Sequence, residues 1–200
     1  ANLESSGVLI VGASSFSIAL AEKLKELGNP VLIADSSEGR LQPARIKNIQ
    51  TYHGEILAEH AQYETDLTPY DTILAMTGDT SYNALVAQSF APEFGYNHTF
   101  SLPAPEHYYK DQTELPLSMK AHLLFDEQAV FTELNRRINT TYTIETIAIH
   151  EKNSIKDGML QDDVLPLFIK KKNQSILFVT LRKKIALEEG DQLIVLKLKK

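Results

Sequence analysis

The stretch VLIVGASSFSIALAEKLKELG, residues 8–28, carries the strongest indication of fold in this chain. It starts with a continuous apolar run, typical of a strand that is buried on both faces of a parallel sheet. Gly12 then makes a tight turn, and apolar residues recur at helical spacing from Phe16 to Leu27 before Gly28 ends the helix. This strand–turn–helix order is typical of the first part of a dinucleotide-binding βαβ unit.

The first hundred residues continue this alternation of strands and helices. We expect further strands at 31–35, 49–53, 71–77 and 98–102, and helices at 41–47, 56–63 and 79–94. Asp79 or Thr80 can cap the last helix. Short apolar strands separated by helices predict a Rossmann-like doubly wound parallel sheet of the α/β class over residues 1–102.

The pattern changes after this sheet. Residues 103–140 are expected to form a linker with three prolines near its start and then a helix over 126–138. Short apolar runs separated by turn residues follow, and we expect strands at 142–150, 164–170, 175–181 and 191–198. Residues 141–200 are therefore predicted to form a small antiparallel β subdomain of α+β type.

Composition excludes several classes of protein. The chain has 200 residues and no cysteine, so it has neither disulfides nor thiolate metal sites. Its apolar runs are shorter than the roughly 18 residues of a membrane-spanning helix. Residues 1–100 carry 5 Lys and Arg against 12 Asp and Glu, which argues against nucleic acid as a ligand. Because the chain begins with alanine, we expect it to be a piece of a longer protein.

The turn after the first strand departs from the usual three-glycine fingerprint, because serines replace the second and third glycines. The amides at the start of the next helix still favour an anion. The second strand ends in an acid 23 residues after the first glycine, where a carboxylate accepts hydrogen bonds from ribose and disfavours a 2′-phosphate. We therefore expect AMP, ADP, ATP, NAD or NADH, rather than NADP, to bind at Gly12, Ala13, Ser14, Ser15, Phe16 and Asp35.

Two later stretches carry a family resemblance. TYHGEIL (51–57) and YDTILAMTGDTSYNALVAQSFAPEFG (70–95) resemble the N-terminal domain of regulators of potassium conductance, the TrkA-N or RCK family. Family members have a Gly-Asp pair after the third strand, and an acidic loop and an Asn-bearing helix after the fourth. The resemblance implies that Ser36, Gly54, Glu55, Ile56, Thr77, Gly78, Asp79 and Asn83 also line the nucleotide site.

One branch of that family is closer still. AQSFAPEFG (87–95), LPLF (165–168) and EEGDQLIVL (188–196) resemble the cytoplasmic regulatory tails of bacterial CPA1-type sodium/proton antiporters. The resemblance implies a non-catalytic ligand-sensing module, paired as a homodimer and covalently linked to a transmembrane antiporter of Na⁺ or K⁺. Its place would be the cytoplasmic face of the cell (inner) membrane.

Two other functions stay open: an NAD-dependent oxidoreductase, and a structural dimerisation module with a vestigial pocket. The residues offer no HExxH or other metal spacing, and GASSF (12–16) lacks the last glycine of a nucleophile elbow, so we expect neither a metal site nor catalytic residues. Basic clusters stand at Lys170–Lys172, Arg182–Lys184 and Lys197–Lys200. They are interpreted as strand-edge protection or, alternatively, as a peripheral contact with anionic membrane lipid.

Overall fold

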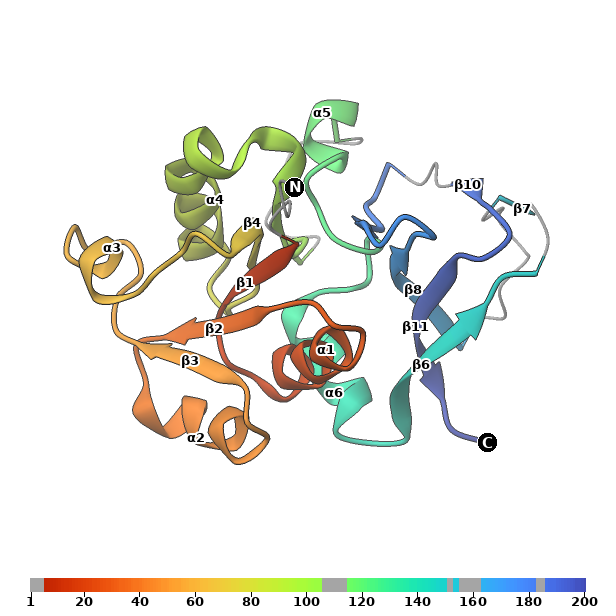
Figure 1. Cartoon of the computed structure of the whole chain (residues 1–200), viewed down its shortest axis with the longest axis horizontal. Coiled ribbons are helices and arrows are strands. Elements are labelled where there is room, and N and C mark those ends of the chain that lie inside the picture. Colours follow the sequence, from red (N-terminus) through yellow and green to blue (C-terminus); the bar gives the residue numbers. More distant parts are fainter. Residues whose placement is uncertain (1–5, 106–114, 151–152, 155–162, 183–185) are drawn as a thin grey trace. The chain divides into compact units, whose positions relative to one another are not determined.

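A computed structural model describes residues 6–105, 115–150, 153–154, 163–182 and 186–200 (Figure 1). The chain divides into two compact units, Ala1–Leu102 and Pro103–Lys200. The segment 103–140, which the sequence sets apart as a linker and helix, is grouped with the second unit.

The first unit contains a five-stranded sheet in the order β3-β2-β1-β4-β5. Every neighbouring pair in it runs parallel, which confirms the predicted doubly wound fold. The strands are β1 (Gly7–Val11), β2 (Val31–Asp35), β3 (Gln50–His53), β4 (Tyr70–Ala75) and β5 (Thr99–Ser101). Strand order reverses between β1 and β4, and ligands of open parallel sheets bind beside such a point, at the carboxyl ends of the strands.

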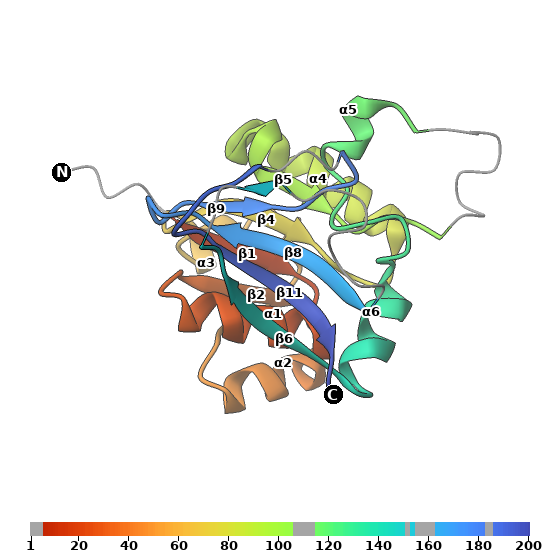
Figure 2. The same cartoon turned by 90° about the vertical axis from the view of Figure 1, so that its right-hand side faces the viewer.

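Helices cover both faces of this sheet: α1 (Ser15–Glu26) and α2 (Glu38–Ile46) lie on one face, and α3 (Ala61–Glu64) and α4 (Thr80–Phe94) on the other (Figures 1 and 2). A short 3₁₀ helix, η1 (Tyr96–His98), follows α4. The core between layers combines strand residues such as Leu9 and Ile73 with Val86 of α4, and each of the three is fully buried. The strand-to-helix turns consequently gather at the carboxyl edge of the sheet.

Two predicted helix ranges in this unit are corrected. The helix expected at 41–47 begins earlier, at Glu38, because the Ser37 hydroxyl caps it by accepting from the amide of Arg40 at 3.3 Å. The helix expected at 56–63 covers only Ala61–Glu64. The chain before it forms a turn, in which the Glu55 carboxylate accepts from the amide of Leu57 at 3.1 Å and so competes with helical hydrogen bonding.

The second unit contains the predicted antiparallel sheet, with four strands in the order β6-β11-β8-β9, and a separate two-stranded pair of β7 and β10. The strands are β6 (Tyr142–Ala148), β7 (Asn153–Ser154), β8 (Val164–Lys170), β9 (Ile176–Phe178), β10 (Ala186–Leu187) and β11 (Gln192–Leu198). Figure 2 shows β11 between β6 and β8. The two-residue strands β7 and β10 are too short to be recognised from hydrophobic alternation.

Two predictions for the second unit are corrected, and one of its helices was not predicted. The helix expected at 126–138 is α6, Phe131–Ile138, because the Asp126 side chain accepts from the amide of Gln128 at 2.8 Å and forms a turn instead. The strand expected at 175–181 ends at Phe178. Residues 179–181, which were expected to continue it, pair with residues 123–125 instead. A single-turn helix, α5 (Leu117–Lys120), was not expected.

Candidate functional site

Gly12 follows β1 at the point where strand order reverses. Its φ is +112°. The end of the neighbouring strand β4 is close, since the amide of Met76 donates to the Val11 carbonyl at 2.8 Å. A Cβ at Gly12 would lie 2.8 Å from the Met76 carbonyl oxygen and 2.9 Å from the amide nitrogen of Thr77. Glycine is therefore required both by the backbone angle and by the close approach of two strand ends.

The two serines that replace the fingerprint glycines bond to each other. Ser14 caps α1, its hydroxyl accepting from the amide of Ser17 at 3.1 Å, and the two hydroxyl oxygens lie 3.0 Å apart. Ser17 is fully buried and Ser15 is exposed. The first serine thus strengthens the helix start, whose macrodipole favours a bound anion.

Asp35, at the end of β2, is a hub of hydrogen bonds. Its Oδ2 accepts from the amide of Ala13 and its Oδ1 from the amide of Ser37, both at 2.8 Å. The Arg40 guanidinium, in the first turn of α2, contacts both oxygens, with Nη2 2.8 Å from Oδ1. Burial by itself raises the pKa of Asp35, but the hydrogen bonds from Arg40 and the two amides outweigh it and hold that pKa below its usual value.

The turn after β3 joins the same edge. The amide of Gly54 donates to the Asp35 carbonyl at 3.0 Å, and Ile56 is buried beneath the turn. Glu55 accepts a short hydrogen bond from the hydroxyl of Tyr82 on α4, which links the turns after β3 and β4. Burial and this contact raise the pKa of Tyr82 above its usual value. Ser36 is exposed nearby.

The turn after β4 is held by its own side chains. The Asn83 Oδ1 accepts from the amide of Thr77 at 2.9 Å and from its hydroxyl at 2.6 Å, and Asn83 Nδ2 donates to the Thr77 carbonyl at 2.9 Å. Asp79 caps α4 by accepting from the amide of Tyr82 at 3.0 Å, while Gly78 is exposed. Asn83 is 3% exposed, so this structure gives it the role of holding the turn.

The structure therefore brings most of the predicted residues together at one edge. Contacts join the glycine loop to Asp35, Asp35 to the β3 turn, and Gly12 to the β4 turn. Sequence reasoning missed Arg40 and Tyr82. The signal for Arg40 was present, since a basic residue in the first turn of a helix follows a strand-end acid by five positions. Tyr82 had no comparable signal, because its partner lies 27 residues away.

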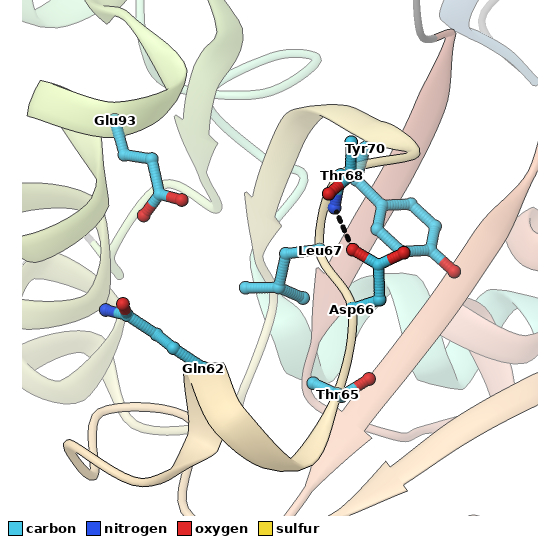
Figure 3. A pocket seen from close by; sticks show the side chains of 7 residues that line it. All are labelled: Gln62, Thr65, Asp66, Leu67, Thr68, Tyr70 and Glu93. Atoms are coloured by element: carbon cyan, nitrogen blue, oxygen red, sulfur yellow. Dashed lines mark hydrogen bonds between the residues drawn. The ribbon is translucent and has the colours of Figure 1, made fainter.

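A pocket of about 370 Å³ lies elsewhere, where β4 begins (Figure 3). Its walls come from α3, the loop before β4 and the end of α4, where Glu93 stands. In that loop the Asp66 carboxylate accepts from the amide of Thr68 at 2.9 Å. Because β4 starts at Tyr70, this pocket is at the amino end of the strand and is separate from the candidate site.

The basic clusters of the second unit are only partly exposed. Lys171 Nζ lies 2.5 Å from Asp191 Oδ2, and Lys170 is 6% exposed at the end of β8. Lys183 and Lys184 lie outside the described residues, while Lys199 and Lys200 are exposed. Within the first cluster, Lys170 and Lys171 are thus built into the unit, whereas Lys172 is exposed.

The described residues contain neither a metal-binding cluster nor a membrane-spanning helix. Nowhere in these residues do three or more His, Cys, Asp or Glu side chains gather as a potential metal site. The helices of the described ranges likewise include none with both the length and the apolar character needed to cross a bilayer.

Comparison with known proteins gives one family match. Residues 8–100 match the family described as TrkA-N domain. No curated protein matches. Among solved structures the chain is similar to the GsuK channel and to the "GsuK channel bound to NAD", each at 14% identity, with TM-scores of 0.48 and 0.47. Both alignments cover 98% of this chain and 37% of that chain, so the chain spans little more than a third of the channel's length. A putative methyltransferase from Thermoplasma acidophilum aligns at 12% identity and a TM-score of 0.27, over 98% of this chain and 69% of that one.

Proposed function

Because residues 8–100 match the TrkA-N domain family, we propose that this chain is a nucleotide-binding regulatory module of a monovalent cation transport system. One observation carries the proposal: the glycine loop, the start of α1 and the strand-end acid lie at the same carboxyl edge, with the amide of Ala13 only 2.8 Å from Asp35. That edge, beside the reversal of strand order, is where doubly wound sheets bind nucleotides.

The proposed ligand is an adenine nucleotide or NAD(H). The start of α1, with Ser15 exposed in its first turn, would receive phosphate. Asp35 would receive ribose, and the turns containing Ser36, Gly54–Ile56 and Thr77–Asp79 would line the remaining cleft. The side chain of Asn83 would act indirectly, by positioning Thr77.

The proposed regulation is a population shift. A nucleotide changes transport only by the difference in its affinity for the two states of the assembly. On the sequence resemblance, the transporter is a sodium or potassium/proton antiporter, covalently linked to this module, with two modules paired on the cytoplasmic face of the membrane. No residue of this chain is given a catalytic role in that proposal.

Thermal unfolding with AMP, ADP, ATP, NAD, NADH and NADP tests the binding function. A ligand at about 100 times its dissociation constant adds about 2.7 kcal/mol, which for 200 residues raises the melting temperature by about 5–10 °C. A shift with AMP, ADP, ATP, NAD or NADH supports the proposal, and no shift with any of these five contradicts it.

A variant at the phosphate end sharpens this test. Asp35→Ala is a poor choice, because Asp35 also holds the glycine loop and α2 in place. Ser15→Asp instead adds a negative charge that suits a helix start but repels phosphate. Thr132→Asp makes the same change in the first turn of α6, in the other unit, and is the matched control. Binding should weaken only in Ser15→Asp.

A second candidate is supported by a specific observation. Two backbone amides and the Arg40 guanidinium donate to both oxygens of the Asp35 carboxylate, an arrangement that also suits a structural dimerisation module in which Asp35 only fixes the turns. The nucleotide panel separates the two functions, since a purely structural module melts at the same temperature with every ligand.

A further inference from the structure

Arg40 and Asp35 form a two-point ion pair at the candidate ribose position. Arg40 Nε lies 3.0 Å from Oδ1 and 3.2 Å from Oδ2, and Nη2 lies 2.8 Å from Oδ1. Such forked contacts between guanidinium and carboxylate are among the stronger hydrogen bonds in proteins. The pair joins the end of β2 to the first turn of α2.

This pair uses the acceptor sites that a ribose would need. A carboxylate offers about four lone-pair positions. Asp35 accepts from the amides of Ala13 and Ser37 and makes three contacts with Arg40, so both oxygens are fully engaged. A ribose hydroxyl can therefore donate to Asp35 only after one of these donors has left.

Arg40 is the donor that can leave. The amides of Ala13 and Ser37 belong to turns that are fixed by β1, β2 and the caps of the adjacent helices. The Arg40 side chain is 59% exposed and ends a long flexible stem, whereas the Asp35 side chain is only 6% exposed. Rotation of the arginine toward solvent would free acceptor sites on both oxygens without moving the backbone.

We propose that Arg40 occupies the ribose-binding oxygens of Asp35 in the nucleotide-free protein and sets nucleotide affinity, because a ligand must displace it. This inference rests on the nucleotide-binding function proposed above. Arg40 thus lowers nucleotide affinity and raises the ligand concentration at which the module responds. A free carboxylate would bind the same ribose without this competition.

The test is calorimetric titration of the full chain with AMP and with NAD. Arg40→Gln should tighten binding about tenfold, the factor that corresponds to losing one competing charge-assisted contact. Arg45→Gln is the matched control: it removes the same charge from the same helix, but Arg45 pairs with Glu38 and donates to the Thr51 hydroxyl at 2.9 Å. Its affinity should equal that of the wild type.

The titrations distinguish failure of the Arg40 inference from failure of the proposed nucleotide-binding function. Unchanged or weaker binding in Arg40→Gln, with binding in the wild type, overturns the inference and leaves the proposed function standing. Binding in Arg40→Gln alone supports the inference, and absence of binding in every protein overturns both. If Arg40→Gln does not fold, Arg40→Lys replaces it. A lysine cannot bridge both carboxylate oxygens of Asp35, so nucleotide binding should tighten about threefold. Unchanged or weaker binding in Arg40→Lys overturns the inference.

Discussion

Replacing Gly12 by alanine should destabilise the chain more than the same change at two other glycines of the first unit. At Gly12 the φ of +112° costs an alanine about 1–3 kcal/mol. Its Cβ would also lie 2.8 Å from the Met76 carbonyl oxygen and 2.9 Å from the Thr77 nitrogen, both backbone atoms, and such overpacking costs about 1–3 kcal/mol more. The free energy of unfolding should therefore fall by about 2–6 kcal/mol.

Gly28 and Gly39 separate these two costs. Gly28 has a φ of +87° but no heavy atom within 4 Å of the place that an alanine Cβ would take, so alanine there should cost only about 1–2 kcal/mol for the backbone angle. Gly39 lies inside α2 with its nearest neighbour, the Ser37 hydroxyl, 3.9 Å away. Alanine at Gly39 should stabilise the chain by about 0.5–1 kcal/mol through helix propensity.

Urea unfolding followed by far-UV circular dichroism measures all three changes on the full chain. The expected order of stability is Gly39→Ala, wild type, Gly28→Ala and Gly12→Ala, and each kcal/mol corresponds to about 2–4 °C in melting temperature. Equal losses at Gly12 and Gly28 would refute the reasoning, because the approach of the β4 backbone would then carry no energetic cost.

Three further predictions concern single side chains. Asp191→Ala removes the buried acceptor of the Lys171 ammonium and of two backbone amides, so chemical denaturation should show a loss of about 3 kcal/mol; a loss below about 1 kcal/mol would contradict this. In Asp35 and Asp191 burial alone raises the pKa, but hydrogen bonds from cationic side chains and amides outweigh it and lower the folded-state pKa. The stability that the two carboxylates contribute is therefore complete above the ordinary aspartate pKa of about 3.9 and is lost as the pH falls through their folded-state pKa values. The melting temperature of Asp191→Asn should therefore fall less steeply with acid than that of the wild type. Equal slopes of melting temperature against pH would count against this prediction. Ser14→Ala should cost about 1 kcal/mol by uncapping α1 but Ser14→Gly only a few tenths, and no loss in urea unfolding of Ser14→Ala would show that the hydroxyl does not cap the helix.

Local sequence was sufficient to predict the strands and helices that have a clear apolar pattern along their whole length. The strand ending at Val11 and the helix ending at Glu26 match prediction within about two residues, because apolar periodicity and end signals are local properties. The turns were predicted less well. Residues 56–60 have a helical apolar pattern, yet the Glu55 side chain binds the local backbone and delays the helix to Ala61.

The candidate site was predictable in position but not in its contacts. Parallel topology places all strand-to-helix turns at one edge, so a glycine after β1 and an acid after β2 were expected to be neighbours. The position of Arg40 in the sequence signalled one partner of Asp35, but the set of five hydrogen bonds to the carboxylate was not predictable, because it depends on side-chain geometry in the folded chain.

The alternation of strands and helices, the parallel sheet of the first unit and the antiparallel sheet of the second could all be predicted from the sequence. These follow from periodicity, which records which residues face a core. The contacts of Arg40 with Asp35, of Tyr82 with Glu55 and of Asn83 with the β4 turn depend on the folded arrangement. The physical reason is that such contacts depend on where separate elements place their side chains in space, and periodicity carries no information about that placement.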